Sequence, residues 1–218
     1  TLKEYVSRMK EDQKEIFYLT GESREQVENS PHLEAFKEKG IEVLYLVDTV
    51  DELLTQSLNE YDGKRLKSVG KGTVNLGNEE EKKQTEEELK AREEELKPLL
   101  DLLQQKLDEH VKQVRLTNRL TTSPVCLVGA EHDYSPQLEK LLQKGKGGGP
   151  KQRRILELNP KHDILGKLKA RFDQDQNDPI LDQYAQLLFG YGVLAEGSEM
   201  PEPTKFNKAV AELMTTSL

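Results

Sequence analysis

The run GKGGGPK at residues 145–151 is the stretch whose residue types most invite a chemical role. Glycine-rich loops cradle phosphates when a strand leads into them and a Lys-Ser or Lys-Thr pair follows the last glycine. Here Pro150 and Lys151 follow the last glycine, and no strand-like run precedes the loop. We therefore interpret the segment as a flexible loop rather than a nucleotide site.

The histidines and the single cysteine suggest neither a metal site nor a nucleophile. His32, His110, His132 and His162 are scattered, and none has another histidine or a cysteine at ligand spacing. Cys126 stands in an apolar, strand-like run, where a buried and unreactive thiol is expected. His162 is placed for a local hydrogen bond near the start of a helix. We find no catalytic constellation among these residues.

Composition narrows the classes of partner. The 218 residues carry a net charge of −8 with a pI near 5.2, which argues against nucleic acid or an anionic membrane. No apolar run approaches the roughly 20 residues of a membrane span, and no signal peptide is recognisable. The lone cysteine indicates a reducing compartment, so we expect a cytoplasmic protein. Because the chain opens at Thr1 within a helical pattern, we expect it to be part of something longer.

A short amphipathic segment is the first candidate for binding another protein. A helix of roughly two or three turns is predicted to begin at Ser135-Pro136. Its apolar side chains are those of Tyr134, Leu138, Leu141 and Leu142. The helix either packs on a sheet, which is the default, or keeps its apolar face partly open as a binding site for proteins.

The stretch from residue 178 onward has more apolar surface than one face of a helix needs. Asp178 and Pro179 start a helix that Gly197 ends, and a second helix starts at Pro203. The two helices carry Leu181, Tyr184, Leu187, Leu188, Tyr191, Leu194, Phe206, Val210, Leu213 and Met214. With Phe189 and Val193 off the main stripe, the first helix is apolar on two sides. One interpretation is a dimer closed by a four-helix bundle, and the other is a helical hairpin within a monomer.

Residues 1–69 are predicted to form a small α/β unit. Strands are expected at residues 15–19, 41–47 and 64–69, with helices between them. This alternation favours a parallel sheet with right-handed crossovers. A helix capped by Asp48 or Thr49 carries an apolar face made of Val50, Leu53, Leu54 and Leu58.

Residues 70–97 read as a charged connector. Glycines at the start indicate a loop, after which EEEKKQTEEELKAREEELK repeats its glutamate triplets every seven residues. A short coiled coil is one interpretation of that period. Only Leu89 and Leu96 are in step with it, fewer than a coiled coil needs, so we favour a solvated helical connector. Pro98 is expected to kink or restart the helix.

Residues 98–218 are predicted to form a second, α+β unit. Strands are expected at residues 113–117, 125–128 and 154–158, the first two joined by a turn. A helix should start at Asn159-Pro160. In the third strand we expect Ile155 to point inward, and Arg154 and Glu157 to face solvent.

Five segments carry a family resemblance. The chain resembles the ninety-kilodalton heat-shock chaperones in their bacterial form through TLKEYVSRMKEDQKEIFYLTG, SPHLEAFKEKGIEVLYL, VDELLTQSLNEYDGK, VRLTNRLTTSPVCLV and LELNPKHDILGKL. The match runs in order along nearly the whole chain. It is weakest at the connector and the glycine loop.

The resemblance implies a role for each unit. Residues 1–69 would be the end of the family's middle domain, and residues 98–218 its dimerisation domain, whose last two helices form a four-helix bundle with a second chain. Two places would contact client proteins. They are the short helix with Tyr134, Leu138, Leu141 and Leu142, and the pair Glu52 and Leu53, where Leu53 replaces the aromatic residue common in the family.

The family's ATP and Mg²⁺ site belongs to an N-terminal domain that no part of this sequence resembles. The resemblance therefore implies no cofactor and no enzymatic activity for this chain. We predict a homodimer that offers apolar surface to partly folded proteins. The alternatives are an adaptor that binds one folded partner through residues 1–69, and a hydrolase or transferase with a site between the two units.

Overall fold

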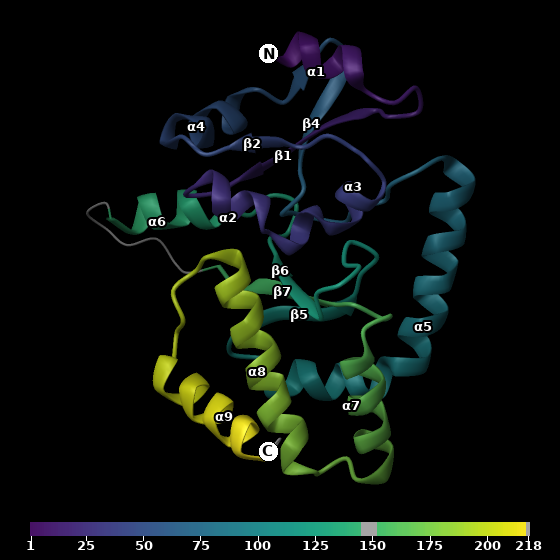
Figure 1. Cartoon of the computed structure of the whole chain (residues 1–218), viewed down its shortest axis with the longest axis vertical. Helices are drawn as coiled ribbons and strands as arrows, with labels where there is room; N and C mark the ends of the chain where they lie inside the picture. Colours follow the sequence, from purple (N-terminus) through teal and green to yellow (C-terminus); the bar gives the residue numbers. More distant parts are fainter. Residues whose placement is uncertain (145–151, 217–218) are drawn as a thin grey trace.

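The computed structural model describes residues 1–144 and 152–216 (Figure 1). These residues form two mixed α/β units joined by one long helix. The elements of the first unit are α1 Leu2–Arg8, β1 Glu15–Thr20, α2 Arg24–Glu28, the 3₁₀ helix Pro31–Leu33, α3 Glu34–Glu38, β2 Leu44–Leu46, α4 Thr49–Ser57, β3 Glu60–Tyr61 and β4 Lys64–Ser68. The others are α5 Glu79–Lys106, β5 Val111–Leu116, β6 Val125–Val128, α6 Pro136–Lys144, β7 Arg154–Leu158, α7 Asp163–Gln174, α8 Pro179–Glu196 and α9 Pro203–Thr216.

The first unit contains a four-stranded sheet in the order β2-β1-β4-β3. Strand β1 pairs in parallel with both β2 and β4, which confirms the parallel pairing predicted from the sequence. The antiparallel edge strand β3 was not predicted. It is joined to β4 by Asp62-Gly63, and both residues have a positive φ. An Asp-Gly pair is the sequence signature of a two-residue hairpin turn.

The second unit contains a three-stranded sheet in the order β5-β7-β6. Strand β7 pairs in parallel with β5 and antiparallel with β6, so the strands predicted at residues 113–117 and 125–128 are not neighbours. Leucines from α5, α7 and α8 pack on one face of this sheet and form the larger core of the described chain. The helix predicted to start at Asn159 begins at Asp163, where His162 is the N-cap and its Nδ1 accepts from the amide of Ile164 (3.2 Å).

The prediction that Arg154 and Glu157 face solvent is wrong. Arg154 is 6% exposed and Glu157 is 2% exposed. Both lie on β7, the central strand, whose second face is covered as well, so neither side of the strand reaches water. Glu157 instead accepts from Arg119 (Nε to Oε2, 2.7 Å) and Arg115 (Nη2 to Oε1, 2.6 Å). Burial alone would raise the pKa of Glu157, but the two guanidinium groups outweigh burial and lower it.

The same buried Arg119 ties the two units together. Its guanidinium donates to the backbone carbonyls of Val69 and of Gly72, which follow β4. From the other direction, the carboxylate of Glu34 on α3 accepts from the backbone amides of residues 121–123, the shortest of these bonds being 2.7 Å. Charge-assisted hydrogen bonds of this kind fix the first unit against the second.

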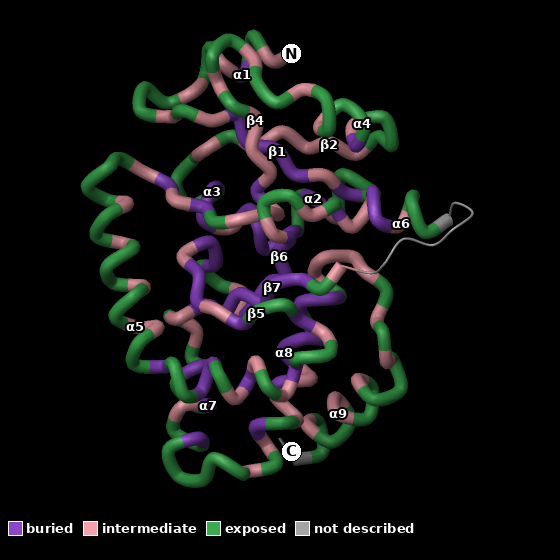
Figure 2. Tube along the Cα trace, turned by 180° about the vertical axis from the view of Figure 1, so that it is seen from behind, coloured by how far each residue is buried: buried purple, intermediate pink, exposed green. Residues whose placement is uncertain are grey.

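Helix α5 crosses the predicted boundary between connector and second unit without a break. Asn78 caps it, and Pro98 lies inside it. Figure 1 shows the ribbon of α5 turning before it runs beneath the three-stranded sheet, as a proline within a helix causes. The half before Pro98 is largely exposed (Figure 2). Leu96 packs into this chain's own core, which favours the solvated connector over a coiled coil.

Candidate protein-binding surfaces

The groups considered for catalysis are buried or scattered. Cys126 is 1% exposed, and burial raises the pKa of its thiol well above the usual value. His32 is buried too, and desolvation together with Arg119 lowers its pKa to about 3. Within residues 1–144 and 152–216, no group of three or more His, Cys, Asp or Glu side chains is placed to hold a metal ion. The glycine run at 145–151 lies outside the described residues.

Several large apolar side chains remain exposed on or beside α4, α6, α8 and α9. They are Val50, Leu53 and Leu54 of α4, Tyr134, Leu141 and Leu142 at α6, and Tyr191, Leu194 and Met214 of α8 and α9. Contiguous exposed apolar side chains mark sites where another protein binds. None of the described helices is long and apolar enough to span a bilayer.

Helix α6 is both docked and open. Leu138 is 9% exposed and faces the body of the molecule, whereas Leu141 and Leu142 are exposed. The two possibilities weighed from the sequence therefore both hold in part. The inner side of the helix packs on the protein, and the outer side stays accessible.

Helix α4 meets the start of α6 through Glu52, the first residue of the pair predicted at positions 52 and 53. Glu52 is 3% exposed, and its Oε2 accepts from the hydroxyl of Ser135, the residue before α6 (2.6 Å). The same hydroxyl oxygen accepts from the amide of Leu138 (3.0 Å). Leu53 points to solvent. The structure thus brings the two predicted client-contacting places together, and Figure 2 shows α4 and α6 at the same edge of the molecule.

The apolar face predicted for α4 is largely on its outer side. Val50 and Leu54 are exposed together with Leu53, although their helical spacing alone suggests a buried stripe. We call the six residues Val50, Leu53, Leu54, Tyr134, Leu141 and Leu142 the α4–α6 surface. The sequence signal for Val50 and Leu54 was present, but nothing in it shows whether a stripe is covered.

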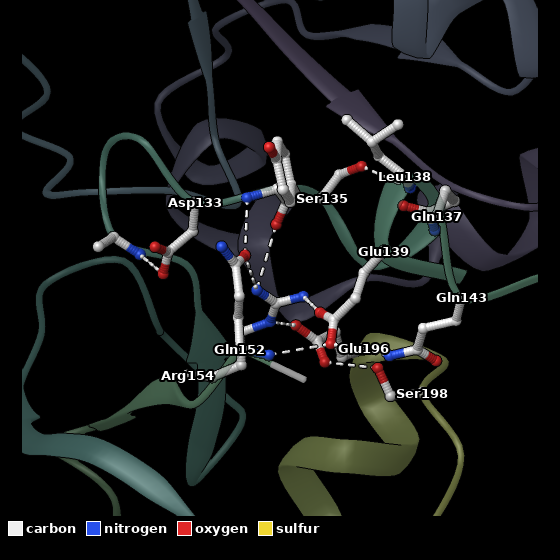
Figure 3. Close-up of polar contacts among 12 residues, drawn as sticks. Asp133, Ser135, Gln137, Leu138, Glu139, Gln143, Gln152, Arg154, Glu196 and Ser198 are labelled. Atoms are coloured by element: carbon white, nitrogen blue, oxygen red, sulfur yellow. Dashed lines mark hydrogen bonds and ion pairs between the residues drawn. The ribbon is translucent and has the colours of Figure 1, made fainter. Parts of the chain in front are cut away.

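The inner, polar side of α6 is fastened by a buried ion cluster (Figure 3). Arg154 of β7 pairs with Glu139 of α6 (2.7 Å) and with Glu196 at the end of α8 (3.1 Å). Burial raises the pKa of Glu196, and Arg154 opposes that shift. Lys140 of α6 donates to the carbonyl of Gly197 just beyond α8 (2.9 Å). The sequence does not predict this cluster, because the pattern of the strand places Arg154 on a solvent-facing side.

The residues predicted for a dimer contact divide into two sets. Leu181 and Leu188 are buried in the core of this chain, together with Phe189 and Val193, so their surface is already covered. Leu194 is exposed. With Tyr191, which is also exposed, and the half-buried Tyr184 and Leu187, it forms a row along one side of the helix that we call the α8 stripe.

Helix α9 packs beside α8 at a glycine. A Cβ on Gly190 would lie 2.2 Å from the ring of Phe206, so only glycine permits this approach. Val210 and Leu213 of α9 are half-buried, and Met214 is exposed. The helix pair expected from the sequence, α8 and α9, therefore packs together within one chain. The α8 stripe lies beside this contact.

Comparison with known proteins gives one family. A family model described as "Hsp90 protein" matches residues 1–218. Proteins named "Chaperone protein HtpG" from Nocardia farcinica and Frankia casuarinae are 48% and 47% identical over 100% of this chain and 34% of their own length. The protein of that name from Geobacter sulfurreducens is 46% identical over 98% of this chain and 33% of its own length. The chain thus spans about a third of the length of the curated relatives it matches.

Proposed function

The chain belongs to the Hsp90 protein family, and from that premise we propose that it acts as a chaperone dimer. In this proposal α8 and α9 join two copies, and the α4–α6 surface binds partly folded proteins. The observation that carries it is the meeting of two exposed apolar helices, one from each unit, at the hydrogen bond between Glu52 and Ser135. The relatives named "Chaperone protein HtpG" agree with this role.

The chemistry of the α4–α6 surface suits partners without a fixed sequence. Its six side chains are five aliphatic ones and a tyrosine, and each is between 41% and 65% exposed. Covering side chains that are about half exposed contributes roughly 1 kcal/mol each before the entropy of association is subtracted. The sum corresponds to weak, reversible binding. We also propose that neither nucleotide nor metal takes part, because apolar contact is the interaction that this surface offers.

One charge placed on the surface should weaken binding. We expect Leu142→Asp to reduce the affinity for reduced, carboxymethylated α-lactalbumin, a permanently unfolded protein, by about fivefold or more, because a carboxylate must be desolvated where a leucine was covered. Fluorescence anisotropy of the labelled probe measures the affinity. Leu53→Asp should have a similar effect if α4 belongs to the same surface.

Gln56→Asp is the matched control, because it adds the same charge at an exposed position of α4 without removing apolar surface. Its affinity should stay within about 1.5-fold of the unmodified chain, since an exposed charge has little effect in water. Binding that is unchanged in both Leu142→Asp and Leu53→Asp would contradict the proposed function.

A further inference from the structure

Three nitrogen atoms of the buried Arg154 guanidinium each reach a different part of the chain (Figure 3). Nη2 contacts Oε2 of Glu139 on α6 (2.7 Å), and Nε contacts Oε1 of Glu196 at the end of α8 (3.1 Å). Nη1 donates to the carbonyl oxygen of Tyr134, just before α6 (3.1 Å). One side chain thus links the start of α6, its middle and the last residue of α8.

The partners of Arg154 are themselves held in place. The free oxygen of Glu196 accepts from the hydroxyl of Ser198 (2.6 Å). The free oxygen of Glu139 accepts from the amide of Gln152 (3.0 Å). Lys140 adds a second attachment to the same end of α8 and an ion pair with Glu22, just before α2 (2.7 Å). The cluster therefore has a fixed geometry rather than a set of loose surface pairs.

Apart from this cluster, α6 is held by the hydrogen bond between Ser135 and Glu52 at its start, by a hydrogen bond from Thr20 to Gln137 (3.4 Å) and by the packing of Leu138. The helix has nine residues, and isolated helices of that length are marginal in water. Of its three leucines only Leu138 is buried. Its orientation therefore depends on its polar attachments, and among the cations that hold it Arg154 is the most deeply buried.

We infer that Arg154 is a positioning residue for the α4–α6 surface. Its guanidinium holds α6 against β7 and the end of α8 in the orientation that presents Leu141 and Leu142 beside α4. Without it the outer leucines no longer share one surface with Leu53 and Leu54, and an unfolded chain meets two separate patches. This inference rests on the proposed function, because it concerns how that same binding surface is assembled.

Arg154→Lys tests the inference while keeping the buried positive charge. A single ammonium group cannot contact Glu139, Glu196 and the Tyr134 carbonyl in the geometry of a planar guanidinium. We expect amide hydrogen exchange at residues 139–143 to accelerate about tenfold while exchange in β5 and β7 stays unchanged. The same variant should bind reduced, carboxymethylated α-lactalbumin about fivefold more weakly. Arg171→Lys, which alters an exposed ion pair between α7 and Asp178, is the matched control. It should change neither the exchange rates nor the affinity for the probe.

The exchange pattern separates positioning from general stability. Unchanged exchange at residues 139–143 overturns the inference. Equal acceleration in α6 and in the sheet also overturns it, because Arg154 would then only stabilise the fold. Tighter probe binding by Arg154→Lys contradicts the claim that docking assembles the surface. If the unmodified chain does not bind the probe, the proposed function fails, and the exchange measurement still decides whether Arg154 holds α6.

Discussion

Replacing both Tyr191 and Leu194 with aspartate should convert the proposed dimer to monomers at micromolar concentration. These two members of the α8 stripe are 41% and 57% exposed in one chain, so their apolar surface is available to a second copy. A two-fold contact repeats each change, which places four carboxylates in the interface. Desolvating carboxylates without partners costs several kcal/mol, and each 1.4 kcal/mol is about tenfold in affinity. We expect at least about 100-fold weaker association.

Light scattering after size exclusion measures this effect directly. The unmodified chain should have a mass near twice 24.9 kDa, and the double variant a mass near 24.9 kDa. Leu54→Asp on α4 is the matched control and should keep the larger mass, because Leu54 lies on the α4–α6 surface. Leu188 is unsuitable for this purpose, because it is 3% exposed and a charge there disrupts the core of the chain. A double variant that keeps the dimer mass would rule out the α8 stripe as the contact.

Arg119→Met should destabilise the fold by about 3–5 kcal/mol at neutral pH, as the loss of one member of a buried ion pair does. Glu157 would keep only Arg115 as a charged partner, and the carbonyl of Val69 would lose its donor. Urea denaturation at one protein concentration gives the change from the midpoint, provided that the slope stays constant. Arg171→Met removes an exposed pair instead and should change stability by less than about 1 kcal/mol.

The destabilisation by Arg119→Met should also shrink in acid. The pKa of Glu157 is lowered in the folded chain, so the stability that its ionised form contributes is present above the unfolded pKa of about 4.3. That contribution is lost as pH falls through the lower folded pKa. Without Arg119, burial makes the pKa of Glu157 higher than it is in the unmodified chain. The variant therefore loses less folding stability than the unmodified chain as the pH falls. A difference in unfolding free energy that stays constant from pH 7 to about pH 3 would contradict this account of the ion pair.

Local signals in the sequence placed many elements correctly. Asp178 caps α8 as expected, and Gly197 ends that helix with a positive φ. Pro98 lies within one continuous helix, which is one of the two outcomes that the sequence allowed. These features depend on residues within one helical turn of each other, so short-range patterns are sufficient to predict them.

Features that depend on distant partners could not be predicted in the same way. Glu157 pairs with a residue 38 positions away, and Arg154 with one 15 positions away. A charged residue in a strand predicts a solvent-facing side unless its ion-pair partner is known. No short-range sequence pattern shows that β7 lies between β5 and β6. The same limit applies to α8. Its apolar pattern includes Leu188, which the core covers, and Leu194, which stays exposed, because helical spacing does not tell which side is already packed.

The central claim is that the two exposed apolar regions have different occupants. A photoreactive benzoylphenylalanine placed at position 142 or at position 194 tests it in one measurement, with unfolded α-lactalbumin present. Position 142 on α6 should crosslink to the unfolded probe, and position 194 on α8 should crosslink to a second copy of the chain. Capture of the probe at position 194, or of a second copy at position 142, would contradict the account.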